Sequence, residues 1–113
     1  MKKILLFWVM LCVSLSSNYA QNASTRVFTN PLLPSGADPY SFYKDGYYYY
    51  THTTQKSLKI WKTKNLAGLK TAESKTIWTP PQGTMYSKEL WAPEVHFLQG
   101  KWYMYFAGDD GDN

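Results

Sequence analysis

The chain has 113 residues, of which 44% are hydrophobic and 18% aromatic, and 12 Lys or Arg against 8 Asp or Glu give a formal net charge of +4. Without Lys2 and Lys3, which belong to the export signal predicted below, the charge is 4 − 2 = +2, too small to favour nucleic acid or a membrane surface as the partner. The chain has a single cysteine, Cys12, so no disulfide can form within it. Stability must come from a packed core, and ten Tyr, five Trp and five Phe make the chain unusually aromatic.

The first 20 residues have the pattern of an export signal. Lys2 and Lys3 form a positively charged start, residues 4–13 are almost all apolar, and a short polar stretch ends at Ala20. The apolar run is too short to span a bilayer. We therefore expect cleavage after Ala20, export to the periplasm or the medium of a bacterial cell, and no membrane attachment of the mature chain.

The rest of the chain is predicted to have two parts. Residues 21–35 are polar and then proline-rich and show no helical period, which predicts an extended lead-in. Residues 36–113 are predicted to be folded, and they end in an acidic turn with no closing element after it. We therefore interpret residues 36–113 as the N-terminal part of a larger, truncated domain.

A β-hairpin is predicted for residues 38–53. Asp45-Gly46 lies between two aromatic runs, which is the strongest short-range signal for a hairpin turn. Asp38 stands where the first strand begins, and the proline after it favours an extended backbone at Asp38. A carboxylate fixed there among aromatic rings could be a catalytic base or a sugar ligand. An aspartate before a proline is also a common turn starter.

Two further strands are predicted before the next hairpin. Residues 58–63 alternate apolar and polar side chains, which is typical of a strand. Residues 65–69 are predicted to be a turn, and residues 75–79 an edge strand that two prolines stop. The mature chain shows no convincing amphipathic helix.

Residues 91–106 repeat the pattern of the first hairpin. An offset of 54 positions pairs Pro39 with Pro93 and Gly46 with Gly100. A self-similar unit of about 50 residues holding about four short strands is typical of a propeller blade. Since a propeller needs at least about four blades to close, the chain is predicted to hold one blade and the first half of a second.

Two acids break this repeat. The same offset places Ala92 opposite Asp38 and Tyr40 opposite Glu94. Each acid stands near a strand entry, where the central channel of a propeller would lie. Residues that break a structural repeat are better functional candidates than those that keep it.

Two motifs in this order resemble glycoside hydrolase family 43. They are residues 36–40 (Gly-Ala-Asp-Pro-Tyr) with the hairpin after them, and residues 90–97 (Leu-Trp-Ala-Pro-Glu-Val-His-Phe) with residues 100–106 (Gly-Lys-Trp-Tyr-Met-Tyr-Phe). The resemblance implies an all-β fold, a five-bladed β-propeller with an axial active site, of which only the first blade and part of the second are present. The family includes arabinofuranosidases, β-xylosidases and arabinanases.

The resemblance also implies roles for four residues. The aspartate of the first-blade Asp-Pro motif is the general base in that family, which makes Asp38 the expected catalytic base. The Trp-Ala-Pro segment lines the sugar pocket, so Trp91 and Glu94 are expected to bind substrate, with His96 on the strand face of Glu94 to orient it. The structural alternatives are packing of Trp91 between blades, a buried ion pair of Glu94, and a hydrogen-bonded structural His96. The acid that protonates the leaving group and the aspartate that tunes its pKa would lie beyond Asn113.

The resemblance implies a secreted glycosidase that hydrolyses O-glycosyl bonds of plant polysaccharide side chains. The expected activity is that of an inverting α-L-arabinofuranosidase on arabinose- or xylose-containing polymers, with these 113 residues inactive by themselves. The alternatives are a β-xylosidase of the same family, a non-catalytic carbohydrate-binding propeller and a small adhesion module. No cofactor is expected, because two isolated histidines do not make a metal site, although members of the family can hold a metal ion in the axial channel.

Overall fold

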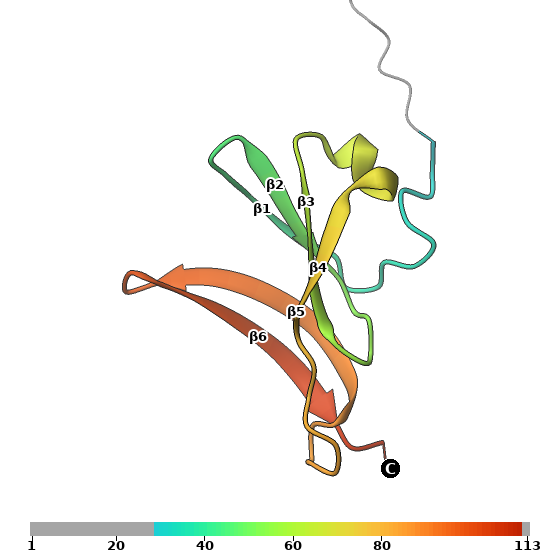
Figure 1. Cartoon of the computed structure of the whole chain (residues 1–113), viewed down its shortest axis with the longest axis vertical. Coiled ribbons are helices and arrows are strands. Elements are labelled where there is room, and N and C mark those ends of the chain that lie inside the picture. The colour runs from blue at the N-terminus through green and yellow to red at the C-terminus, as the bar shows by residue number, and fades with distance from the viewer. Residues whose placement is uncertain (1–28, 112–113) are drawn as a thin grey trace, which may run out of the picture.

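The computed structural model describes residues 29–111. The predicted signal at residues 1–20 and most of the predicted lead-in lie outside the described residues. Within residues 29–111, no helix is long and apolar enough to cross a membrane. The described part consists of two antiparallel β-sheets and one 3₁₀ helix (Figure 1), so the predicted all-β class is confirmed.

The first sheet has four strands in the order β1-β2-β3-β4, so that each strand pairs with the next one in the chain. A 3₁₀ helix, η1, lies between β3 and β4 (Figure 1). The bounds of these elements are β1 Tyr40–Lys44, β2 Tyr47–Thr51, β3 Leu58–Thr63, η1 Leu66–Thr71 and β4 Glu73–Trp78. Four antiparallel strands in chain order are the arrangement of one propeller blade.

The helix η1 replaces the simple turn that was predicted there. The side chain of Asn65 accepts the backbone N–H of Ala67 at 3.1 Å and so caps the helix. Leu69 is only 2% exposed and anchors the segment in the core. A six-residue 3₁₀ helix with one buried leucine is too short to give a hydrophobic period, so the sequence pattern did not reveal it.

The second sheet contains two antiparallel strands, β5 Lys88–Leu98 and β6 Lys101–Asp109. Both hairpins turn through two residues with positive φ, which is the type I′ turn that matches the twist of the strands. The angles are 50° at Asp45 and 81° at Gly46, and 49° at Gln99 and 80° at Gly100. Since these pairs stand 54 positions apart, the predicted repetition of the hairpin is confirmed.

Strand β1 lies against β5 and joins the two sheets (Figure 1). The hydroxyl of Tyr40 donates to the backbone carbonyl of Val95 at 2.9 Å. The ring of Phe42 stacks on the ring of Trp102, with 4.9 Å between the centroids. Hydrogen bonds and ring contacts of this kind hold the second hairpin against the first sheet.

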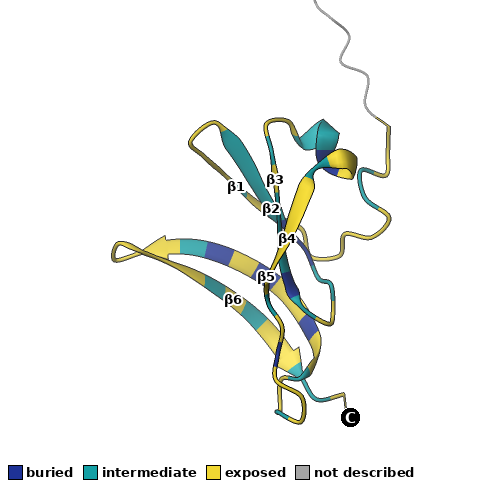
Figure 2. Ribbon diagram, viewed as in Figure 1, coloured by how far each residue is buried: buried dark blue, intermediate teal, exposed yellow. Residues whose placement is uncertain are grey.

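Buried positions are few, and Figure 2 shows most of the ribbon as intermediate or exposed. The buried apolar side chains are Leu58, Leu69, Leu90 and Val95. They come from β3, η1 and β5, so the core lies where the first sheet meets the start of the second hairpin. Leu90 and Val95 belong to the second predicted motif, whereas the first motif leads into β1.

Candidate active site

Asp38 lies just before β1 with its side chain exposed. Its φ of 53° is in the left-handed region, so the extended backbone predicted from the following proline is wrong. A following proline disfavours the right-handed helical region, and aspartate tolerates the left-handed one better than most residues. In this conformation the carboxylate reaches the end of β2, where Asp38 Oδ2 accepts a hydrogen bond from Thr53 Oγ1 at 2.7 Å.

Thr53 connects Asp38 to the second motif. Its backbone N–H donates to the carbonyl of Ala37 at 3.0 Å, which continues the hairpin beyond the last paired residues of β1 and β2. Its hydroxyl oxygen accepts the backbone N–H of Ala92 at 2.9 Å. The Asp-Pro motif and the Trp-Ala-Pro motif, far apart in the chain, therefore meet at one threonine side chain.

The sequence analysis did not single out Thr53, although one signal for it exists. Tyr40 pairs with Thr51 across the first hairpin. In an antiparallel pair, each step back along one strand matches one step forward along the other. Two such steps from the pair Tyr40–Thr51 place Thr53 opposite Asp38. The two-residue turn therefore determines which side chain faces the carboxylate.

The second motif is built on an irregular strand. The register of β5 with β6 shifts on both sides of Trp91, and Ala92 has a φ of 46°. An alanine in the left-handed region costs about 1–2 kcal/mol, and such irregularities are common beside active sites because they redirect side chains. The side chain of Trp91 is 42% exposed, and none of the aromatic rings in the described segment stacks on it.

Glu94 and His96 follow Trp91 on β5 and form a pair. Nε2 of His96 lies 2.9 Å from Oε2 of Glu94, and the side chains are 39% and 54% exposed, respectively. The ring of His96 packs between Tyr40 and Tyr105, with centroid distances of 5.6 Å and 5.8 Å. The contact shows that Glu94 and His96 share a strand face, as predicted, and within residues 29–111 the pair is exposed.

A buried histidine stands beside Thr53. His52 is 4% exposed, and its ring stacks on Trp61 at a centroid distance of 4.6 Å. Among the described residues, no hydrogen-bond partner is found for His52 Nδ1. Burial, with a smaller contribution from Lys59, lowers the pKa of His52. This neutral ring anchors the end of β2, from which Thr53 emerges toward Asp38.

Metal-ligating side chains do not cluster in the described region. Within residues 29–111, no group of three or more His, Cys, Asp or Glu side chains could hold a metal ion. His52 lies in the core, whereas the imidazole of His96 contacts Glu94. The site described above therefore consists of two carboxylates, one hydroxyl, the imidazole of His96 and an exposed indole.

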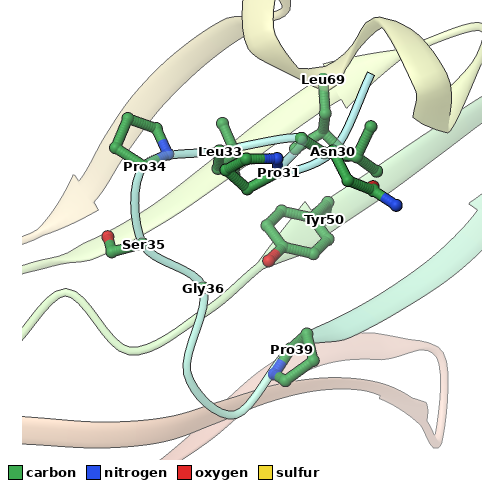
Figure 3. Close-up of a pocket in the computed structure, with 10 residues that line it drawn as sticks. Asn30, Pro31, Leu33, Pro34, Ser35, Gly36, Pro39, Tyr50 and Leu69 are labelled. Atoms are coloured by element: carbon green, nitrogen blue, oxygen red, sulfur yellow. The ribbon is translucent and has the colours of Figure 1, made fainter. Parts of the chain in front are cut away.

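A cavity of about 740 Å³ lies away from these residues. It is an open hollow lined by residues 30–36, together with Pro39, Tyr50 and Leu69. Figure 3 shows the lead-in passing around Tyr50 and Leu69 at this cavity. The lining is mostly apolar, and it includes no predicted site residue.

Sequence comparison identifies the class of protein. The sequence model described as Glycosyl hydrolases family 43 matches residues 28–113. The chain therefore belongs to glycosyl hydrolases family 43, as the two motifs predicted.

Named relatives in this family are arabinofuranosidases. The chain is 46% identical over 83 residues to the extracellular exo-α-(1→5)-L-arabinofuranosidase of Streptomyces avermitilis, covering 71% of this chain and 17% of that protein. It is 32% identical to α-L-arabinofuranosidase 43 of Humicola insolens, with the same coverage of both.

A solved structure of an arabinofuranosidase also matches this chain. The crystal structure of α-L-arabinofuranosidase from Lactobacillus brevis matches with a TM-score of 0.68 and 40% identity, covering 76% of this chain and 28% of that one. The chain thus spans about a sixth to about a quarter of the relatives it matches.

Proposed function

We propose that this protein is an exported α-L-arabinofuranosidase in which Asp38 is the general base of an inverting hydrolysis. The observation that carries the proposal is the position of the Asp38 carboxylate, which Thr53 links to the backbone of Ala92 beside Trp91. Membership of the glycosidase family and the names of the relatives support the reaction and the sugar. The extracellular relatives and the predicted signal support export.

In the proposed reaction, a water oxygen forms a bond to the anomeric carbon of arabinose while the bond from that carbon to the leaving oxygen breaks. The ionised Asp38 carboxylate accepts one proton from the water, and a carboxylic acid on the other side of the sugar gives its proton to the leaving oxygen. In an inverting glycosidase these two groups stand about 6.5–9.5 Å apart, which leaves room for the water.

We assign the second acid to a part of the protein beyond these 113 residues. In this proposal β1–β4 form the first of five blades and β5–β6 begin the second. The later blades would supply the leaving-group acid and the aspartate that tunes its pKa. This assignment agrees with the small share of the relatives that the chain covers.

The second motif would hold the sugar. The exposed indole of Trp91 offers an apolar face on which a sugar ring can stack. The Glu94 carboxylate would accept hydrogen bonds from sugar hydroxyls, while His96 keeps it in place through their contact. Arabinan or the arabinose side chains of arabinoxylan would be the polymeric substrates.

Replacement of Asp38 tests this proposal in the complete protein. Asp38→Asn keeps the shape of the side chain and removes the base, so kcat on an aryl α-L-arabinofuranoside should fall by about 100-fold or more. Binding of arabinose should persist. The measurement is steady-state hydrolysis, together with NMR detection of the first-formed anomer, which should be the β-form.

Asp45→Asn is the matched control. Asp45 is also an aspartate with positive φ, but it lies in the hairpin turn and pairs with Lys44. Asn-Gly suits a type I′ turn, so this variant should hydrolyse at nearly the normal rate. Normal turnover by Asp38→Asn would contradict the role of Asp38, and faster hydrolysis of an aryl β-xyloside than of the arabinofuranoside would make the protein a β-xylosidase instead. Sugar binding without hydrolysis by the unaltered protein would indicate a non-catalytic propeller.

A further inference from the structure

The hydroxyl of Thr53 has a defined direction. The backbone N–H of Ala92 can only donate, so Thr53 Oγ1 is the acceptor of that 2.9 Å bond. The carboxylate oxygen of Asp38 is an acceptor when ionised, so the Thr53 hydroxyl proton lies in the 2.7 Å contact with Asp38 Oδ2. One bond therefore orients the hydroxyl, and the other uses that orientation to hold the carboxylate.

The second carboxylate oxygen of Asp38, Oδ1, is available to accept a proton. Within residues 29–111, Asp38 Oδ1 makes no hydrogen bond, and the side chain is exposed. A carboxylate with one oxygen held and the other open can accept a proton along one direction. Misplacement of a reacting group by about 1 Å can cost about 100-fold in rate, so the bond to Oδ2 has kinetic consequences.

We propose that Thr53 is a positioning residue for the Asp38 base, setting its carboxylate in register with the Trp91-Ala92 segment. This inference rests on the proposed function of Asp38. The backbone of Thr53 is held separately by its N–H bond to the Ala37 carbonyl at 3.0 Å. The end of the hairpin therefore does not depend on the hydroxyl, and the hydroxyl can be removed without opening the strand pair.

Three replacements at position 53 separate hydrogen bonding from shape. Thr53→Val keeps the branched shape and removes both hydroxyl bonds, so kcat should fall about 10-fold or more while KM changes by less than about threefold. Thr53→Ser keeps the hydroxyl and should retain kcat within about threefold. Thr53→Cys differs from serine by one atom but is a weak donor, so it should lose activity as valine does.

The adjacent Thr54 provides the matched control. Its hydroxyl donates to the backbone carbonyl of Ser57 instead of to Asp38. Thr54→Val therefore removes a hydroxyl from the same strand end without touching the carboxylate, and its kcat should stay near that of the unaltered protein. Thermal melting of all variants reports whether each is folded. If Thr53→Val does not fold, the comparison of the serine and cysteine variants decides.

The outcomes separate this inference from the proposed function. In the Asp38→Asn background, Thr53→Val should cause no further loss, because no base remains to be positioned. Normal kcat for Thr53→Val, or equal losses for the serine and cysteine variants, would overturn the positioning role. If Asp38→Asn is inactive and Thr53→Val is normal, only the positioning role fails. If Asp38→Asn itself is active, the proposed function fails.

Discussion

Asp38 and Ala92 occupy the same position of the two repeated units, and both have a left-handed backbone, with φ values of 53° and 46°. The backbone conformation therefore belongs to the repeat, and the carboxylate is what distinguishes the first unit from the second. Both residues also bond the hydroxyl of Thr53, Asp38 through its side chain and Ala92 through its N–H. The repeat therefore sets the backbone geometry at this point, and in our proposal the carboxylate of Asp38 adds the chemistry.

The buried His52 makes the stability of the protein depend on pH. Since the pKa of His52 is lowered in the folded state, the unfolded chain takes up a proton first as the pH falls through the ordinary histidine pKa of about 6.5. Stability should be greatest above this value. As the pH falls below about 6.5, the stability should decrease. The decrease should end once the pH is below the lowered pKa of His52 in the folded state.

His52→Phe tests this effect, because phenylalanine keeps a ring against Trp61 and cannot be protonated. When the pH is lowered from about 7 to about 5, the denaturant midpoint of the unaltered protein should decrease. The midpoint of His52→Phe should decrease less. Equal declines for the two proteins would show that other groups cause the pH dependence.

The sequence indicated Asp38 as a candidate base but did not indicate its hydrogen-bond partner Thr53. Asp38 could be found because it breaks a repeat and precedes a proline, and the shared face of Glu94 and His96 follows from strand alternation. The position of Thr53 opposite Asp38 also follows from the register of the hairpin. Its bond to Ala92 could not be predicted, because it depends on how β5 crosses the end of β2 and on a register shift at Trp91.

At the scale of elements, the two hairpins are the parts that the sequence predicted best. Asp-Gly and Gln-Gly stand at equivalent turn positions, and both have the positive φ values that a type I′ turn requires. The helix η1 was missed, because one side-chain cap and one buried leucine determine it. Turns that depend on local residue types could therefore be predicted from the sequence. Elements that depend on contacts with the rest of the fold could not.

Gly100→Ala should destabilise the second hairpin. The φ of Gly100 is 80°, and a Cβ there would meet no atom within 4 Å, so the cost comes from the backbone alone. We expect a loss of about 1 kcal/mol in the free energy of unfolding. Chemical denaturation of the complete protein measures it.

Gly68→Ala in η1 is the matched control for that substitution. A Cβ at Gly68 would have only Thr63 Oγ1 nearby, at 3.8 Å, and no positive φ is imposed there. This variant should be neutral or slightly more stable, because alanine is the better helix former. If Gly100→Ala were as stable as Gly68→Ala, the account of the turn would be wrong.

At the scale of the molecule, the second hairpin presents aromatic side chains that the first sheet does not cover. Tyr103 is 42% exposed and Tyr105 54%, and their ring centroids lie 6.4 Å apart. Adjacent exposed rings of this kind mark a surface that another part of a protein or a partner covers. They support our proposal that a further blade packs beside β5–β6. The repeat predicted blades from residues alone, whereas the number of five came from the family resemblance.

The most direct test of the central claim is a crystal structure of the complete Asp38→Asn protein with an arabinose-containing oligosaccharide. We predict that the sugar lies against Trp91, with a water about 2.6–3.2 Å from the side chain of residue 38. This water should lie on the face of the anomeric carbon opposite the leaving oxygen. A sugar bound away from residue 38, for example in the cavity beside Tyr50 and Leu69, would contradict the account.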